Sequence, residues 1–516
     1  MLNAALTGDA RQERMLADPY AQGLKLSAQG RHAQAIEQFE RALAADPNDS
    51  RTLFALGNTA RALGMGRPAE EFYRRVLAVE PGRLEALVNL ANLLRAQGQF
   101  EAAEALLKPA LARNPKAPEL WLTLGSAYRE MGDAAQAKAH YREAVARRPN
   151  YAAALGNLAD LLADDGEHDA AMALYDRALK AEPDNAQAKT NRAVLHFLQG
   201  NLKQGWRDYA ARLKLKGKVP VADHGLPRWS GGTLRRTRLL VTAEQGVGDQ
   251  IMFASPIPDL AARAAADGGS VIVECEPRLD ALFARSFPHA TVRSWDIEGR
   301  EGVTRTRYGW LKAAGGANAF IEMGSLPRVL RNDIADFPAP NAFLRPDAAE
   351  TARWRATFAA LPRPLTGLCW RSGLTGGHRA LQYASLEIWA AFIRELPGTP
   401  VCAQYDATAE EIAALSALSG REIAAPRDID QKNELDRTAA LLSALDAMVS
   451  APTAASWLAA ATGVATYKIL YDTSWTSFGE SYEPFAPAAR CMMPGVRGNW
   501  AEVFAQTRLK LQPASS

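Results

Sequence analysis

The residues whose types could do chemistry lie in a glycine-rich turn near the middle of the chain. An apolar run at 239–243 leads into Glu244, and the turn at 246–250 then opens an apolar helical run. Glycines permit a tight turn, so the carboxylate of Asp249 is expected near a helix N-terminus. A simple helix cap is the alternative, and the length of the motif alone favours it. The neighbours that shape the turn are Gly246, Gly248 and Gln250.

This turn differs from two common phosphate-binding motifs. Ile251 stands at the third glycine position of a dinucleotide fingerprint, and no Lys-Ser/Thr pair follows as in a Walker loop. The turn therefore predicts a positioned carboxylate, not a dinucleotide or nucleoside-triphosphate site.

A second group of candidate residues follows later strand-like runs. Arg371 ends the run at 367–371, and Arg379 follows in a glycine-rich turn. Two arginines at the carboxyl end of a strand suit a phosphate or a carboxylate, although they can also be ordinary surface arginines. The stretch 445–458 predicts a strand, a turn and a helix, whose first amides and Thr453 would form an anion site.

Alternating strands and helices must position both groups. Strand-like runs at 238–243, 270–275, 319–323, 366–370, 400–404, 446–450 and 464–470 alternate with helical stretches such as 258–266 and 386–396. This alternation predicts parallel sheets. The proline-rich stretch from 336 to 364 suggests a hinge between two Rossmann-like halves, the GT-B arrangement, with ligands at the carboxyl ends of the strands. A TIM barrel also alternates, but it gives no reason for this break.

The first two hundred residues are a repeat array. Glycines recur every 34 residues from Gly30 to Gly200, and prolines recur at the same interval from Pro47 to Pro183. This is the tetratricopeptide period, and it predicts six pairs of helices. The last repeat carries Gly205-Trp206 and lacks the proline, so we expect a capping repeat that becomes a linker.

The concave face of such an array suits an extended peptide or a partner helix. One row at 34-residue steps consists of Asn89, Thr123, Asn157 and Asn191. Amide side chains can pair with a peptide backbone, as in the asparagine ladder of the O-GlcNAc transferase superhelix, which this row resembles. Ordinary polar residues on a solvated face are the alternative.

Composition excludes several other classes of protein. The net charge of +3 gives no electrostatic case for nucleic acid, and no run has the length of a signal peptide or a membrane span. The four cysteines are far apart, and no metal-ligand spacing links them to the seven histidines. We therefore expect a cytoplasmic protein without a bound metal, a tightly bound cofactor or a membrane partner.

Two resemblances make these expectations more specific. The stretch 244–256, with Gly-Asp before an apolar helix and a proline, is similar to the start of heptosyltransferase-type glycosyltransferases. In that family the aspartate of Gly-Asp is the catalytic base, which implies Asp249 here, with Glu244 the other candidate. The family's Asp-Thr and histidine correspond to Pro452-Thr453 and Trp457 in this chain, which argues against an ADP-heptose donor.

Nearly the whole chain resembles the bacterial tetratricopeptide glycosyltransferases that modify flagellin, although each motif alone is weak. The resemblance rests on the array ending in Gly-Trp and on the motifs at 244–249, 370–373, 404–405, 428–433 and 450–454. It implies that the array recruits flagellin and that the second half transfers a nonulosonic acid, such as pseudaminic or legionaminic acid, from its CMP form. The donor-binding residues implied are Arg371, Ser372, Arg379, Gln404, Tyr405, Lys432, Asn433, Pro452, Thr453 and Ala454. Lys432 and Asn433, together with Asp428 and Asp430, can equally cap the next helix.

The resulting hypothesis is an inverting, metal-independent transferase that acts on Ser or Thr. Two alternatives stay open: a flagellin adaptor or chaperone with an inactive transferase half, and a transferase that uses a nucleotide-diphosphate sugar. We expect a tail at 1–15, repeats at 16–217, a linker at 218–237, an acceptor-side Rossmann-like domain at 238–345, and a donor-binding Rossmann-like domain with a C-terminal helix at 346–516.

Overall fold

The computed structural model describes residues 18–215, 221–222, 224–244, 246–300, 303–337, 342–373 and 382–512. The chain forms two compact units, Met1–Asn185 and Ala186–Ser516.

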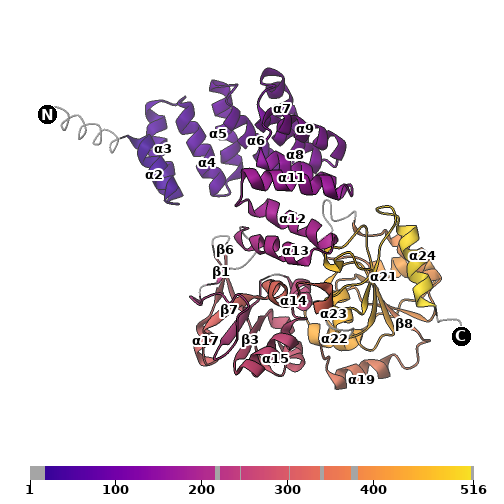
Figure 1. The fold of residues 1–516 in the computed structure, drawn as a ribbon. Helices are drawn as coiled ribbons and strands as arrows, with labels where there is room; N and C mark the ends of the chain where they lie inside the picture. Colours follow the sequence, from indigo (N-terminus) through magenta and orange to yellow (C-terminus); the bar gives the residue numbers. More distant parts are fainter. Residues whose placement is uncertain are drawn as a thin grey trace. The chain divides into compact units, whose positions relative to one another are not determined.

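The first unit is an all-α solenoid of helix pairs, coloured indigo to purple in Figure 1. Its helices are α2 (Pro19–Ala28), α3 (His32–Ala45), α4 (Ser50–Ala62), α5 (Gly66–Val79), α6 (Leu84–Ala96), α7 (Phe100–Arg113), α8 (Pro118–Glu130), α9 (Ala134–Arg147), α10 (Ala152–Asp164) and α11 (His168–Ala181). Each pair follows the 34-residue period, so the repeat prediction is confirmed.

Two kinds of glycine explain the period. Gly64 and its equivalents have positive φ and end the first helix of each pair, which side chains with a Cβ do poorly. Gly57 lies where the two helices of a pair approach, because a Cβ there would lie 2.7 Å from the ring of Tyr73. The glycine and the large ring on the second helix therefore pack as one unit in each such repeat.

The last helix pair, α12 (Ala186–Leu198) and α13 (Leu202–Tyr209), belongs to the second unit. The 3₁₀ turn η1 (Ala210–Lys214) continues it. The indole Nε1 of Trp206 donates a 2.7 Å hydrogen bond to the backbone oxygen of Arg331. Its ring joins an aromatic cluster made of Phe197, Trp206, Tyr209, Phe253, Phe337, Trp475, Phe478 and Phe485. The last repeat is therefore part of the core of the α/β unit.

The first large sheet is parallel and has the order β4-β3-β2-β7. Its strands are β2 (Arg238–Thr242), β3 (Ser270–Cys275), β4 (Ala290–Ser294) and β7 (Ala319–Glu322), and its helices include α14 (Val247–Phe253), α15 (Ile257–Asp267), α16 (Asp280–Ser286), α17 (Gly309–Ala313) and α18 (Pro327–Leu330). A small sheet, β1-β6-β5, comprises β1 (Val221–Ala222), β5 (Asp296–Arg300) and β6 (Val303–Arg307). The central strands are buried on both faces, as apolar runs in parallel sheets are.

The second large sheet is also parallel, with the order β12-β11-β10-β8-β9. Its strands are β8 (Leu365–Cys369), β9 (Thr399–Cys402), β10 (Ala447–Ser450), β11 (Ala465–Ile469) and β12 (Ala489–Met492). Its helices are α19 (Ala348–Thr357), α20 (Leu386–Arg394), α21 (Ala409–Ser419), α22 (Leu435–Leu442), α23 (Ala454–Ala461) and α24 (Trp500–Leu511), several of which are labelled in Figure 1.

The prediction of parallel sheets is confirmed, and seven expected strands correspond to β2, β3, β7, β8, β9, β10 and β11. The TIM-barrel alternative is wrong, because the described strands form separate sheets with different edge strands and no closed ring. The expected hinge contains a helix, α19, which packs against α22. Strands β1, β4, β5, β6 and β12 were not predicted.

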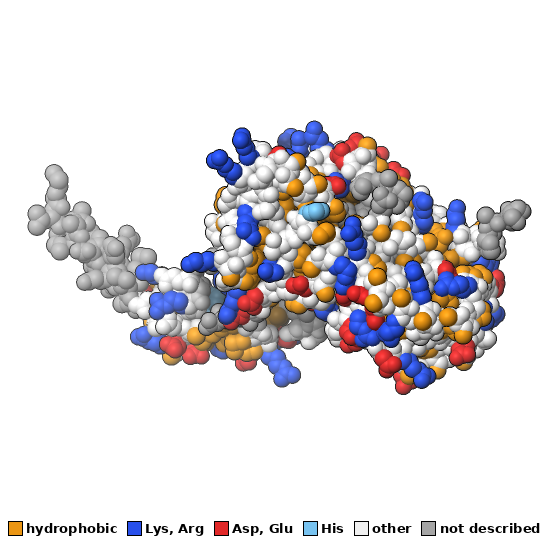
Figure 2. All heavy atoms as spheres, turned by 90° about the horizontal axis from the view of Figure 1, so that it is seen from below, with side chains coloured by type: hydrophobic (Ala, Val, Ile, Leu, Met, Phe, Trp, Pro, Cys, Tyr) orange, Lys and Arg blue, Asp and Glu red, His pale blue; other side chains and the backbone are white. Residues whose placement is uncertain are grey.

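Charges of both signs are interspersed on the face drawn in Figure 2, in line with the small net charge. Over the described part of the chain, no helix combines the length and the apolar character that crossing a bilayer requires.

Candidate functional site

The two large sheets meet through the helices that follow their central strands. Helix α14 follows β2, helix α23 follows β10, and the two helices pack against each other. A Cβ on Gly248 would lie 3.5 Å from the Cα of Ala454. The glycine turn and the Pro452-Thr453-Ala454 turn, which are far apart in sequence, are therefore direct neighbours at the carboxyl ends of two parallel sheets.

Asp249 lies in the first turn of α14, after the N-cap residue Gly246. The side chain is partly buried, and no described lysine, arginine or histidine forms an ion pair with it. Burial raises the pKa of Asp249 to about 6, the charge of Glu244 adds to the rise, and a hydrogen bond from the backbone of Gly246 opposes it. A carboxylate with this pKa is a good proton acceptor near neutral pH.

Glu244 has a different environment. The side chain is buried, and its Oε1 accepts hydrogen bonds from Arg212 Nη2 at 2.6 Å and from the backbone amide of Gly324 at 2.6 Å. A carboxylate held in this way by a buried guanidinium is poorly placed to take a proton from a substrate. Of the two predicted catalytic carboxylates, the geometry favours Asp249.

Gln250 is buried, and its side-chain oxygen accepts a 2.8 Å hydrogen bond from the backbone amide of Glu276. This bond ties α14 to the segment that follows β3. Gln250 therefore fixes the position of the glycine turn at 246–250 through this hydrogen bond.

Arg371 follows β8, at the expected end of the strand. Its guanidinium forms ion pairs with Asp406 at 2.9 Å and with Glu411 at 2.6 Å, and these two carboxylates raise its pKa. An anionic ligand would have to compete with both of them. Arg379, the second predicted arginine, lies outside the described residues.

Gln404 and Tyr405 support the turn after β8. The side-chain oxygen of Gln404 accepts hydrogen bonds from the amides of Trp370 at 2.9 Å and Arg371 at 3.0 Å. The Tyr405 hydroxyl accepts a hydrogen bond from the amide of Gly373. The Ser372 hydroxyl is 2.8 Å from the Tyr383 hydroxyl. These predicted donor-binding residues shape the backbone of the loop.

The start of α23 offers an anion site through its backbone. Thr453 is buried, and its hydroxyl lies 3.2 Å from the Ser450 hydroxyl and 3.5 Å from the Cys369 sulfur. The Thr453 hydroxyl therefore has partners within the protein. An anionic ligand would have to bind the backbone amides in the first turn of α23. Pro452 is exposed next to it, at the tip of the turn.

Trp457 is buried on α23. The Lys468 ammonium lies 4.1 Å from the centre of its ring and pairs with the buried Glu483. The indole therefore covers a buried ion pair, a packing role that an imidazole would fill less well.

Lys432 and Asn433 are exposed in a turn before α22. The Asp430 carboxylate accepts hydrogen bonds from both of their amides at 3.0 Å. The backbone oxygen of Lys432 accepts a 2.8 Å hydrogen bond from Arg278. Asp430 thus closes the turn before α22, whose N-cap residue is Glu434, and the Lys432 backbone joins the segment after β3 to the second sheet.

The four polar residues that recur at 34-residue steps in the array have different environments. Asn89 donates a 2.9 Å hydrogen bond to Asn58, which also accepts one from the Tyr73 hydroxyl. Thr123 is buried and bonds to the backbone of its own helix. Asn191 accepts a hydrogen bond from Gln187, and Asn157 is partly buried. Of these four, Thr123 is unsuited to contact a peptide.

Glu274, on β3, is a buried carboxyl group that the sequence analysis missed. Burial raises its pKa to about 8, although the amide of Ala243 and the Tyr308 hydroxyl donate hydrogen bonds to it. In the sequence, the group could be noticed only as a charged residue inside the apolar run at 270–275.

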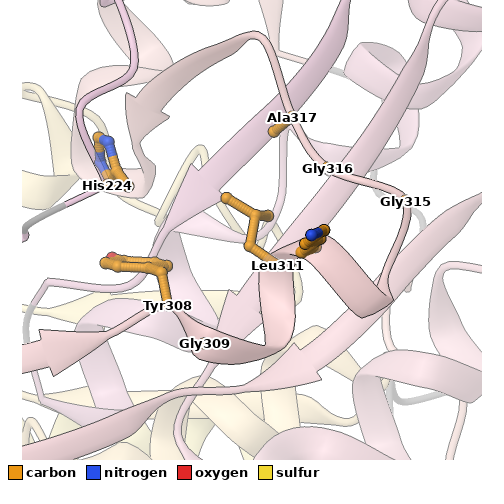
Figure 3. A pocket seen from close by; sticks show the side chains of 8 residues that line it. His224, Tyr308, Gly309, Leu311, Gly315, Gly316 and Ala317 are labelled. Carbon is orange, nitrogen blue, oxygen red and sulfur yellow. The ribbon is translucent and has the colours of Figure 1, made fainter.

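A pocket lies next to Tyr308 (Figure 3). Its volume is about 630 Å³. It is lined by His224, Tyr308, Gly309, Leu311, Lys312, Gly315, Gly316 and Ala317. None of these residues belongs to the predicted site. Among the described residues, no cluster of His, Cys, Asp and Glu has the arrangement of a metal site.

These features define a class of protein: a tetratricopeptide array joined to a parallel-sheet α/β region. The repeat region matches two family models described as tetratricopeptide repeat, one over residues 20–83, 122–185 and 169–214 and the other over residues 68–127.

A particular relative can also be named. Protein FlbA of Caulobacter vibrioides is 32% identical over 323 residues, which is 62% of this chain and 54% of FlbA. The chain thus spans about half the length of this relative. Among solved structures, a thermophilic TPR protein of Thermus thermophilus is 29% identical, with a TM-score of 0.31 over 35% of this chain and 97% of its own. Pseudomonas aeruginosa pilF is 25% identical, with a TM-score of 0.33 over 40% of this chain and 92% of its own.

Proposed function

We propose that the protein is an inverting protein O-glycosyltransferase of the GT-B type that modifies Ser or Thr of flagellin. The observation that carries this proposal is Asp249, a partly buried carboxylate with a pKa of about 6, beside the contact between helices α14 and α23, which follow strands of two parallel sheets. Ligands of open α/β sheets bind at the carboxyl ends of the strands, where this residue lies.

Asp249 would act as the general base. An acceptor hydroxyl must lose its proton as its oxygen attacks the anomeric carbon of the donor sugar. A carboxylate with a pKa of about 6 is ionised at neutral pH and basic enough to accept that proton. The absence of an ion pair with a described cation leaves this carboxylate available to a hydroxyl.

The donor would be a CMP-activated nonulosonic acid, which carries one phosphate and one sugar carboxylate. The backbone amides at the start of α23 suit one of these anions. Arg371 suits the other only if the donor displaces Asp406 or Glu411 from its guanidinium. Stabilising the departing CMP in this way lowers the barrier electrostatically, without a metal ion.

Flagellin would be recruited by the tetratricopeptide array. Stacked helix pairs of this kind present an extended surface that suits a polypeptide partner. We propose that the reaction takes place in the cytoplasm.

The nucleotide of the donor can be tested on the intact protein. Calorimetric titration with CMP, UDP and ADP should give binding of CMP at least tenfold tighter than that of the other two. Tighter binding of UDP or ADP would point to a nucleotide-diphosphate sugar. Binding of none of the three would favour a protein without transferase activity.

A flagellin adaptor is the second candidate, and the closed ion pairs of Arg371 are the observation that favours it. A guanidinium already neutralised by two carboxylates adds little to the binding of an anionic donor. Intact-mass measurement of flagellin from cells with and without the protein separates the two functions. A mass difference that matches a sugar supports the transferase, and equal masses support the adaptor.

A further inference from the structure

Three arginines recur at the 34-residue interval in the helical array: Arg61, Arg95 and Arg129. Each lies in the last turn of the first helix of its pair, which is α4, α6 or α8, all labelled in Figure 1. Because the repeats stack in register, these side chains hold equivalent places on three consecutive repeats. Arg61 and Arg129 are exposed, and Arg95 is partly buried.

Two of the three arginines are neutralised by the repeat that follows. Arg95 binds Glu130 through two parallel hydrogen bonds, from Nε at 2.9 Å and from Nη2 at 2.7 Å. The Nη1 atom of Arg129 lies 3.1 Å from Asp160 Oδ2. Glu130 belongs to α8 and Asp160 to α10, so each carboxylate comes from the first helix of the next pair.

Arg61 has no such partner. The two places on α6 that correspond to the paired carboxylates are occupied by Ala96 and Asn92. The side-chain oxygen of Asn92 already accepts a 2.7 Å hydrogen bond from Arg95. In the part of the chain that the structure describes, Arg61 forms no ion pair. It is therefore an exposed cation at a place where the next two repeats each hold a carboxylate.

Two asparagines lie beside Arg61. Asn58 is three residues before it on α4 and so shares its face of the helix. The side-chain oxygen of Asn58 accepts hydrogen bonds from Asn89 on α6 at 2.9 Å and from the Tyr73 hydroxyl at 2.8 Å. Burial raises the pKa of Tyr73, and hydrogen bonding to Arg61 and Asn89 opposes the rise, so both side chains adjoin this hydroxyl. Among the described residues, the amide nitrogen of Asn58 has no partner, and it is available as a second donor.

A guanidinium with an amide donor beside it suits a carboxylate. The array contains a precedent, because Arg95 holds the carboxylate of Glu130 at the equivalent place. We propose that Arg61, together with Asn58 and Asn89, binds a Glu or Asp side chain of the polypeptide partner. This inference rests on the proposed function, because it names the chemistry by which the array would select flagellin. An acidic segment of the partner would continue the row of ion pairs by one repeat.

The first test measures binding of a short, end-blocked polyglutamate peptide to the full chain at low salt. The wild type is compared with Arg61→Gln and with Arg113→Gln, which removes the same charge from the last turn of α7. Arg113 is also exposed and forms no ion pair among the described residues, so it is a matched control. We expect the Kd to rise about tenfold in Arg61→Gln and to stay near the wild-type value in Arg113→Gln. All three proteins should melt at similar temperatures, because both arginines are exposed.

A second measurement identifies the carboxylate on flagellin. Arg61→Lys keeps the positive charge and supplies an amine, which a carbodiimide joins to an adjacent carboxylate as an amide while the carbodiimide takes up the water. Mass spectrometry of the peptide that contains residue 61 then shows which flagellin residue is attached. We expect an Asp or Glu side chain, and no flagellin attached at residue 113 in Arg113→Lys.

An unchanged Kd for polyglutamate in Arg61→Gln would overturn the proposal, and so would equal weakening in Arg61→Gln and Arg113→Gln. A cross-link from residue 61 only to the C-terminal carboxylate of flagellin would overturn the assignment to a side chain. If flagellin did not bind the wild type at all, the proposed recruitment of flagellin would be refuted. The polyglutamate measurement would still decide whether Arg61 binds carboxylates.

Discussion

Gly248 faces Ala454 closely: a Cβ added to the glycine would lie 3.5 Å from the Cα of the alanine. Each residue follows the central strand of a different parallel sheet. The contact brings a carboxylate from one sheet next to helix amides from the other. It therefore makes the two turns parts of one candidate site.

Enlarging residue 248 should separate the two turns. Gly248→Leu would push α14 away from α23, and we expect transfer to fall by at least tenfold while the protein still folds. Gly248→Ala is the matched control, because its Cβ would meet Ala454 at an ordinary contact distance and alanine favours a helix by about 0.5–1 kcal/mol. Activity and melting temperature are measured for both. Equal activity of the two variants would mean that the contact has no part in the reaction.

Ionisation of Asp249 should affect both activity and stability. Its pKa of about 6 in the folded protein lies above the ordinary aspartate value of 3.8, so the folded state holds the proton more tightly. The contribution to stability is present below pH 3.8 and is lost as the pH rises through 6.

Asp249→Asn should therefore be more stable than the wild type by about 1–3 kcal/mol above pH 6, and inactive. The advantage should shrink toward pH 4, which denaturant unfolding at several pH values can follow. If Asp249→Asn were less stable than the wild type at pH 8, the raised pKa of Asp249 would be wrong.

Glu274 should give a second, separate pH dependence. Burial raises its pKa to about 8, so the folded protein keeps this carboxyl neutral at pH 7. Wild-type stability should then fall as the pH rises from about 4.5 to 8 and level off above it. Glu274→Gln should not show this loss. If the free energy of unfolding changed with pH in the same way for both proteins, Glu274 would not be protonated in the folded state.

The packing of the array predicts separable effects on its two units. A side chain at Gly57 would overlap the Tyr73 ring, so Gly57→Val should destabilise the first unit by about 1–3 kcal/mol and weaken flagellin binding. Nucleotide binding by the second unit should not change. Gly156→Ala is the control, since a Cβ there meets nothing within 4 Å. Calorimetry and binding assays check both variants. A loss of nucleotide binding in Gly57→Val would contradict the prediction that the two units are affected separately.

The periodic and apolar parts of the fold could be predicted from the sequence. Glycines and prolines at a fixed interval specify the helix pairs, and buried runs such as 238–242 and 447–450 specify parallel strands, because local sequence determines both. Strand β4, with mixed burial, and strands β5 and β6 of the small sheet carry no such pattern.

The partners of the candidate site residues could not be predicted in the same way. Arg371 was expected at a strand end and lies there, but its pairing with Asp406 and Glu411 depends on the loop after β9 and on α21. The pairing of Arg212 with Glu244 joins the last repeat to the end of β2. Such contacts between distant segments depend on how helices and strands pack against one another. The spacing of residues in a single sequence does not indicate them.

In the proposed reaction, Asp249 takes the proton of the flagellin hydroxyl to which the sugar is transferred. The most direct measurement is the intact mass of purified flagellin after incubation with the full chain and a CMP-nonulosonate, with wild type and Asp249→Asn in parallel. We predict a mass increase by whole sugar units with the wild type and unmodified flagellin with Asp249→Asn. Unmodified flagellin with the wild type, or equal modification by both proteins, would contradict the account.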